Sequence, residues 1–219
     1  MRQRFLYLHG FASGPGSSKA RFFRQRLEEV GYEVEVPDLS EGDFENLTIT
    51  AQLRVIEQIA DRRRLVLIGS SLGGYLAALY AARHPEVERL LLLAPAFGFA
   101  RRWAETLGPS LETWKRTGWL TVYHYGERTE RRVHYRLIED GLQYEEYPAV
   151  TQPTLIFHGR RDAVVRPSWS EEFVRQRPNA RLEILDSDHE LLDVLDPTWE
   201  RARDFLLAGC TGWGEPKVP

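Results

Sequence analysis

A serine, an aspartate and a histidine in this chain each follow a short apolar segment, where a side chain can meet a ligand. The serine is Ser71, and the segment Gly69–Gly73 around it fits the pattern Gly-x-Ser-x-Gly. That pattern is typical of a tight turn between a strand and a helix, which exposes the serine hydroxyl. A serine hydroxyl attacks a carbonyl group only when a base removes its proton, so a nucleophile at Ser71 needs a histidine and an acid nearby.

The acid and the base are predicted from two later strand ends. Asp162 follows the apolar segment Thr154–Phe157, and His189 follows Leu182–Leu185. If these strands are parallel, their carboxyl ends lie at the edge of the sheet that also presents Ser71. The chain order Ser, Asp, His is that of α/β-hydrolases. We therefore expect Ser71 as nucleophile, His189 as base and Asp162 as acid.

Other readings of these residues remain open. Asp162 is also compatible with an ordinary turn, and Asp188, beside His189, is the reserve acid. His158 precedes a glycine at a strand end and is interpreted as structural. The histidines and carboxylates do not show the spacing of metal ligands, so we expect neither a metal ion nor another cofactor.

Attack on a carbonyl creates an oxyanion, which needs two fixed hydrogen-bond donors. The N–H of Leu72 is one candidate, because it begins the helix after Ser71 and benefits from the helix dipole. The second donor should come from the loop after the first strand, and we assign it to the N–H of Phe11. His9, in the same loop, is expected to organise the loop, since His189 already fills the role of base.

The elements that position these residues alternate between strands and helices. Helical periodicity, for example at Leu72, Leu76 and Leu79, separates the strand-like segments. This rhythm predicts one α/β domain over residues 1–219, with a mostly parallel sheet of about six strands and helices on both faces. The expected strands are Phe5–Leu8, Glu33–Val36, Leu65–Ile68, Leu90–Leu93, Thr154–Phe157 and Leu182–Leu185.

An insert at residues 97–148 interrupts the rhythm. It contains three of the six tryptophans, Trp103, Trp114 and Trp119, and its pattern predicts a short hairpin around 126–128. The insert leaves the sheet at the edge that presents Ser71, so we interpret it as a cap whose tryptophans bind the substrate. The alternative is an insert that packs beside the core without any role at the site. Residues 209–219 are expected to form a flexible tail.

Composition excludes several classes of protein. The 219 residues include 42% hydrophobic and 28% charged side chains and carry a net charge of -3, which is ordinary for a soluble protein and gives no reason to expect nucleic-acid binding. The sequence has no segment apolar enough to span a membrane and no signal peptide, so a cytoplasmic location is expected. Cys210 is the only cysteine, so an internal disulfide is impossible. The oligomeric state stays open.

Five motifs together resemble a known family. They are His9–Phe11, Ser17–Ala20, Gly69–Gly74, Gly159–Asp162 and Asp188–Glu190. This set is similar to the small α/β-hydrolase-fold serine esterases of the YqiA-like group. The resemblance runs through almost the whole chain and is weakest between residues 101 and 147. The antiparallel strands that open the sheet of larger relatives have no counterpart here.

The resemblance implies hydrolysis of carboxylic esters, with Ser71, Asp162 and His189 as the catalytic triad and a small-molecule ester as substrate. Thioesters and amides react by the same chemistry, so an acyl-protein or acyl-CoA thioesterase, or an acyl-peptide hydrolase, is the alternative. A binding module that uses the triad only to capture a ligand is a further alternative. Turnover of a chromogenic ester separates the enzymes from the binding module.

Overall fold

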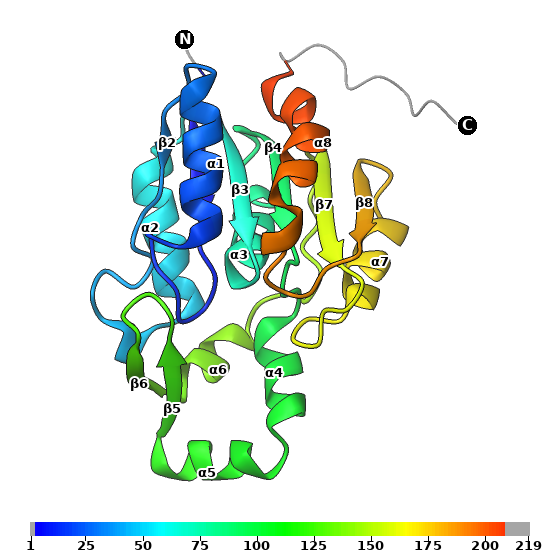
Figure 1. Ribbon diagram of the computed structural model, residues 1–219. Helices are drawn as coiled ribbons and strands as arrows, with labels where there is room; N and C mark the ends of the chain where they lie inside the picture. The colour runs from blue at the N-terminus through cyan, green and yellow to red at the C-terminus, as the bar shows by residue number, and fades with distance from the viewer. Residues whose placement is uncertain (1–2, 209–219) are drawn as a thin grey trace.

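The computed structural model describes residues 3–208, which form a parallel sheet with helices on both faces (Figure 1). The strand order is β2-β1-β3-β4-β7-β8. The strands are β1 (Phe5–Leu8), β2 (Val34–Glu35), β3 (Leu65–Ser70), β4 (Val87–Leu93), β7 (Thr154–Gly159) and β8 (Ala180–Leu185). The chain winds outward in both directions from β1 and β3, and ligands of such sheets bind at the carboxyl ends of the strands where the order reverses. The predicted fold class and the six strands are confirmed.

Five helices cover the sheet. One face carries α1 (Ser18–Glu29) and α8 (Leu195–Leu207). The other face carries α2 (Ile49–Ala60), α3 (Leu72–Ala81) and α7 (Pro167–Arg175). Strand side chains alternate between the two layers: Leu65 and Leu67 of β3 pack with α2 and α3, whereas Val66 and Ile68 pack with α1 and α8. Because both faces are buried, the strand reads as a continuous apolar run, and each buried leucine or valine contributes about 1.5 to 3 kcal/mol to folding.

The insert forms a separate layer beyond the carboxyl ends of the strands (Figure 1). It consists of α4 (Phe99–Leu107), α5 (Pro109–Thr117), an antiparallel hairpin and α6 (Arg136–Gly141). The hairpin pairs β5 (Trp119–His124) with β6 (Thr129–His134), so its turn includes the expected residues 126–128. Two short 3-10 helices, Phe44–Asn46 and Leu192–Val194, lie in the loops after β2 and β8.

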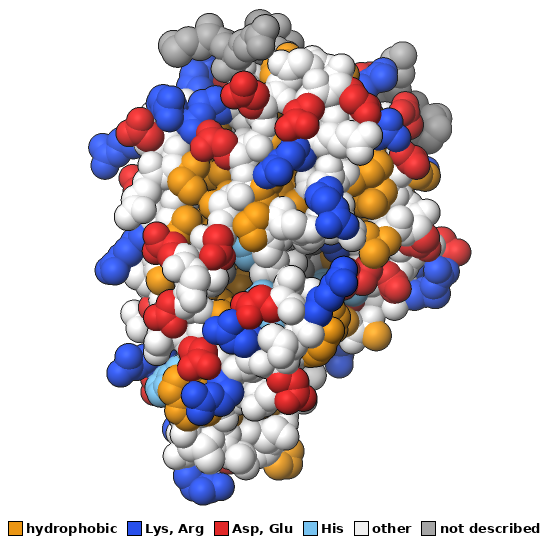
Figure 2. Space-filling view, turned by 60° about the vertical axis from the view of Figure 1, so that its left-hand side comes forward, with side chains coloured by type: hydrophobic (Ala, Val, Ile, Leu, Met, Phe, Trp, Pro, Cys, Tyr) orange, Lys and Arg blue, Asp and Glu red, His pale blue; other side chains and the backbone are white. Residues whose placement is uncertain are grey.

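The surface of the protein is mixed in charge. Basic and acidic side chains are interspersed over the face seen in Figure 2. Among residues 3–208, none of the helices combines the length and apolar character that a membrane span requires. The flexible tail expected at residues 209–219 lies outside the described residues.

Candidate active site

Ser71 occupies a sharp turn between β3 and α3. Its backbone has φ 53° and ψ -119°, a conformation that residues other than glycine adopt at a cost of about 1 to 3 kcal/mol. Four backbone hydrogen bonds hold it: the Ser71 N–H donates to Leu93 O (2.9 Å), and Ser71 O accepts from the N–H groups of Gly74 and Ala96 (both 3.0 Å) and of Tyr75 (3.2 Å). The strain is thus balanced by bonds to the first turn of α3 and to the end of the neighbouring strand β4.

The glycines that flank Ser71 are required by close backbone contacts. A Cβ atom on Gly69 would lie 2.4 Å from Gly73 O, and one on Gly73 would lie 2.1 Å from Leu8 O. Both distances are far shorter than any real carbon–oxygen contact. The Gly-x-Ser-x-Gly pattern therefore has a steric cause in this fold: helix α3 begins directly against the ends of β3 and β1.

The three residues expected to react together lie in one hydrogen-bonded chain. Ser71 Oγ–H donates to His189 Nε2 (3.1 Å), and His189 Nδ1–H donates to Asp162 Oδ2 (2.7 Å). Ser71 and His189 are partly exposed, whereas the Asp162 side chain is fully buried. The reserve acid Asp188 is exposed, and its Oδ1 accepts the N–H of Glu190 instead (2.9 Å).

Asp162 accepts four hydrogen bonds. Oδ1 accepts the N–H groups of Val164 and Val165 (both 2.8 Å), and Oδ2 accepts from His189 and from His158 Nε2 (3.1 Å). Burial acts to raise the pKa of Asp162, but the hydrogen bonds from His158 and His189 outweigh it and hold that pKa well below its usual range. Asp162 is therefore ionised and can only accept, which places the His189 proton on Nδ1 and leaves Nε2 free to accept from Ser71.

The loop after β1 lies against the nucleophile. A Cβ atom on Gly10 would lie 3.4 Å from Ser71 Cβ. His9 organises this loop, because its Nδ1–H donates to Gly10 O (3.0 Å) and its Nε2 accepts the Leu39 N–H (3.2 Å). Burial lowers the pKa of His9, which keeps the ring neutral for both bonds. Within residues 3–208, the N–H of Phe11 has no internal acceptor.

The insert contacts this loop at two points. The Tyr125 N–H, at the tip of the hairpin, donates to Ala12 O (2.7 Å), and Ala12 itself has a φ of 51°. The Trp103 ring lies 4.9 Å from the Phe11 ring, centroid to centroid, and Phe99 lies 5.8 Å from it. The insert therefore holds both the backbone and a side chain of the segment next to Ser71.

The three tryptophans expected at the site occupy different places. Trp103 stands beside Phe11. Trp114 is buried inside the insert, where its Nε1–H donates to Val133 O (3.0 Å). Trp119 packs on the His134 ring, and its other ring contact is with Arg132, so both neighbours belong to the hairpin. Only Trp103 among the three contacts the loop after β1 through its ring.

Two residues near the site make contacts that the sequence did not predict: His158 was interpreted only as structural, and Lys19 only as part of a motif. Fully buried His158 donates to Asp162, as described above. Buried Lys19, at the start of α1, donates from Nζ to Glu190 O (2.8 Å), next to His189. Burial lowers the pKa of Lys19, whereas the charges of Glu190, Asp162 and Asp188 act in the opposite direction. The available signals were the four-residue spacing from His158 to Asp162 and the place of Lys19 in the Ser17–Ala20 motif.

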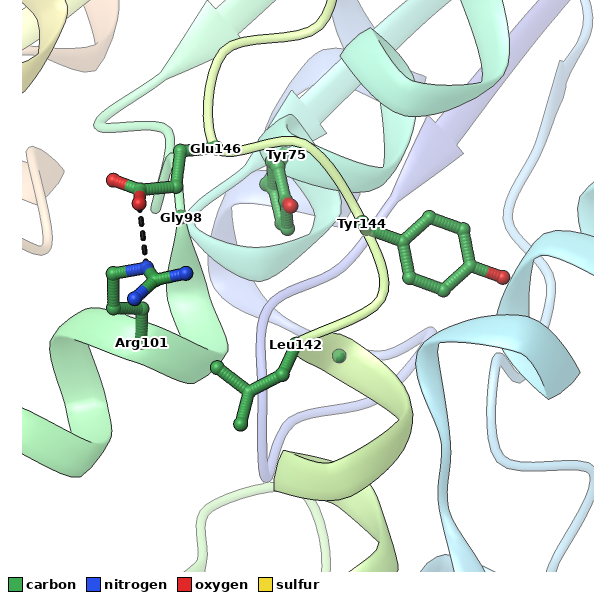
Figure 3. Close-up of a pocket in the computed structure, with 7 residues that line it drawn as sticks. Tyr75, Gly98, Arg101, Leu142, Tyr144 and Glu146 are labelled. Atoms are coloured by element: carbon green, nitrogen blue, oxygen red, sulfur yellow. Dashed lines mark ion pairs between the residues drawn. The ribbon is translucent and has the colours of Figure 1, made fainter.

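A separate, small hollow lies between α3 and the insert. Figure 3 shows Tyr75 from α3 facing Leu142 and Tyr144, while Arg101 pairs with Glu146 (2.6 Å) at its rim. Ser71, Asp162 and His189 are not among the residues that line it. The described part of the chain also has no cluster of three or more histidine, cysteine or acidic side chains that could hold a metal ion.

Solved structures of α/β-hydrolases superpose on the chain at low sequence identity. Alpha/beta hydrolase domain-containing protein 10 from mouse has a TM-score of 0.80 and 19% identity, covering 94% of this chain and 90% of its own. Est1E from Butyrivibrio proteoclasticus, in a structure with ferulic acid bound, has a TM-score of 0.81 and 22% identity, with coverages of 94% and 88%. A monoacylglycerol lipase from Paleococcus ferrophilus has a TM-score of 0.72 and 16% identity, with coverages of 93%. These likenesses establish the fold.

Sequence comparisons address the family. A search of curated proteins gives no significant match. A family model described as Uncharacterised protein family (UPF0227) matches residues 4–206, which is nearly all of the chain that the structure describes. The chain therefore belongs to UPF0227, the YqiA-like family that its motifs predict, and it has the α/β-hydrolase fold.

Proposed function

We propose that the protein is a serine hydrolase that cleaves carboxylic esters through an acyl-Ser71 intermediate. The observation that carries the proposal is the hydrogen-bonded chain from Ser71 Oγ through His189 to the buried, ionised Asp162, with distances of 3.1 and 2.7 Å. This is the geometry that general-base activation of a serine requires. The esterase and the lipase among its structural neighbours support the proposal, because their names place ester chemistry on the same fold.

The reaction begins when Ser71 Oγ attacks the carbonyl carbon of the ester and its proton passes to His189 Nε2. Asp162 remains ionised and stabilises the imidazolium ion that forms. The tetrahedral intermediate carries a negative oxygen, and we assign its stabilisation to the N–H groups of Phe11 and Leu72. The Leu72 N–H lies at the start of α3, where the helix dipole favours negative charge.

Breakdown of the intermediate releases the alcohol, which takes its proton from His189, and leaves the acyl group on Ser71. Water then attacks the acyl enzyme while His189 takes its proton, and the second tetrahedral intermediate releases the carboxylic acid as His189 returns that proton to Ser71 Oγ. The aromatic side chains of the insert beside Phe11, among them Trp103, are proposed to contact the acyl group.

The decisive experiment combines turnover with covalent labelling. We expect the purified protein to hydrolyse p-nitrophenyl esters. We also expect a fluorophosphonate probe to attach covalently to Ser71, with one probe molecule per protein detected by mass spectrometry. Ser71→Ala should remove both activities, whereas Ser70→Ala, one residue earlier in the buried strand, should keep both. Hydrolysis that survives Ser71→Ala, or a label at another serine, contradicts the proposal.

A substrate panel then separates ester hydrolysis from its chemical relatives. The panel holds p-nitrophenyl esters of increasing chain length, an acyl-CoA thioester and an acyl-peptide, each compared by kcat/KM. Highest kcat/KM on the esters supports the proposal. A clear preference for the thioester or the peptide would assign the same triad to the alternative chemistry. Labelling without turnover on any of them would indicate a binding module.

A further inference from the structure

His158 stands at the carboxyl end of β7, with its side chain fully buried. Its Nε2 lies 3.1 Å from Asp162 Oδ2 and 2.9 Å from Val165 O. Its Nδ1 lies 2.8 Å from Ser170 Oγ on α7. Both nitrogens of a solvent-free ring are therefore matched to partners, and one of those partners is the carboxylate that the proposed mechanism requires.

The partners determine where the ring proton lies. Ionised Asp162 and the carbonyl oxygen of Val165 can only accept, so Nε2 must carry the proton and donate to them. The lone pair of Nδ1 then accepts from the Ser170 hydroxyl, which can rotate to donate. Ser170 is itself fully buried. The fold thus holds His158 in a single tautomer, with its Nε2–H shared between Asp162 Oδ2 and Val165 O.

The same oxygen of Asp162 serves two histidines. Oδ2 accepts from His158 and from His189, while Oδ1 accepts two backbone N–H groups. A carboxylate oxygen with a second donor has less electron density to offer the first, and four donors fix the plane of the carboxylate. His158 is therefore placed to limit how strongly Asp162 pulls on the proton that His189 carries.

We propose that His158 is a positioning residue for the triad, which orients Asp162 through Oδ2 and sets the pH range in which His189 works as a base. This inference rests on the proposed esterase function. It differs from a purely structural role in one respect: it makes the pH profile of catalysis depend on the His158 N–H.

Other charged groups near Asp162 lie on α1 and in the loop after β8. Lys19, on α1, interacts with the carboxylate electrostatically, and the exposed Asp188 and Glu190 follow β8 beside His189. Variants of His158 leave these charged groups unchanged. A shift in the pH profile of such variants is therefore attributable to the hydrogen bond at Oδ2.

The test compares His158→Leu, which removes the donor, with His158→Gln, whose amide nitrogen reaches about as far as Nε2. For His158→Leu we expect kcat/KM on the preferred p-nitrophenyl ester to fall about 10- to 100-fold, the range of a hydrogen bond to a charged group. We also expect the midpoint of the acid limb of kcat/KM to move up by about 0.5 to 1 pH unit, because a less shared carboxylate favours the imidazolium form. His158→Gln should restore the midpoint and most of the rate.

Ser170→Ala is the matched control. This substitution removes the hydrogen bond at His158 Nδ1 but leaves the Nε2 donor in place. It should therefore lower the melting temperature without moving the acid limb. If His158→Leu does not fold, His158→Asn replaces it, because the shorter amide reaches toward Ser170 and not toward Asp162.

Two results overturn the inference: an acid limb that stays at the wild-type midpoint when the donor is lost, or one that Ser170→Ala moves just as far. Failure of the esterase function itself would look different, since Ser71→Ala would then leave hydrolysis unchanged. The His158 series is interpreted only with the Ser71→Ala measurement beside it.

Discussion

Replacing Gly73 by alanine places helix propensity and packing in direct conflict. Gly73 lies in the first turn of α3, and inside a helix alanine is favoured over glycine by about 1 kcal/mol. In this structure, however, the added Cβ would lie 2.1 Å from Leu8 O and 2.5 Å from His9 O. Both oxygens belong to backbone at the end of β1, so no change of side-chain rotamer relieves the contact.

The packing effect should win. Overpacking a core costs about 1 to 3 kcal/mol, and a contact with a rigid backbone belongs at the upper end of that range. After the gain in helix propensity, Gly73→Ala should lower the free energy of unfolding by about 2 kcal/mol. Relief requires α3 and the end of β1 to separate by about 1 Å, and a misplacement of that size at reacting groups lowers the rate about 100-fold.

Urea denaturation and ester hydrolysis measure the two effects. Gly14→Ala is the control, because a Cβ on Gly14 meets no atom within 4 Å and its φ is not in the left-handed region. We expect that control to match the wild type in both assays. A Gly73→Ala protein with wild-type stability and kcat would refute the reasoning, because it would show that α3 does not begin against the Leu8 and His9 carbonyls.

Three further predictions concern the acid, the insert and pH. Asp162→Asn should keep the fold but lower kcat by about 10⁴ by favouring the wrong tautomer of the base, whereas Asp188→Asn should cost far less; the reverse order would make Asp188 the acid. Trp103→Ala should raise KM for the preferred acyl chain or shift the preferred length, by about 1 to 3 kcal/mol of discrimination, and Trp119→Ala should not; equal effects in the length series would return the insert to a structural role. The pKa of His9 is lowered in the folded state, so the unfolded chain binds more protons below about pH 6.5. The free energy of unfolding should therefore decrease as the pH is lowered through that range. His9→Asn should flatten that slope in urea midpoints measured from pH 7 to 5, and an unchanged slope would contradict this assignment.

The sheet was predictable because its strands are buried on both faces. Phe5–Leu8 was predicted with the bounds that the structure has, and the turn of the hairpin, expected around residues 126–128, lies between β5 and β6. The edge strand was less predictable: residues 33–36 were expected to pair, but only Val34 and Glu35 do, opposite Phe5 and Leu6 of β1. An edge strand depends on its neighbour more than on its own residues.

The helices of the insert were not located from the sequence. Gly108, with a φ of 51°, separates α4 from α5 and breaks a periodicity that would otherwise read as one longer element. Aromatic side chains of these helices pack on one another, as Trp103 does on Trp114. Their apolar residues therefore do not follow the one-sided helical spacing of a helix that packs on a sheet.

The site was partly accessible by the same reasoning. Strand ends of a parallel sheet meet at one edge, which is why Ser71, Asp162 and His189 could be expected to lie together. The contacts of His158 with Asp162 and of Tyr125 with Ala12 depend on the paths that loops take after the strands end. A single sequence carries no periodic signal for such paths, so these contacts become visible only in three dimensions.

The order of the strands also has a consequence for the timing of synthesis. The proposed base lies 118 residues after the proposed nucleophile, and its loop follows β8, the last strand to be made. At 5 to 20 residues per second, a ribosome needs on the order of 10 s to travel from one to the other. During that interval the nascent chain holds Ser71 without its proposed base, so the proposed reactivity toward esters requires that the final strand has joined the sheet.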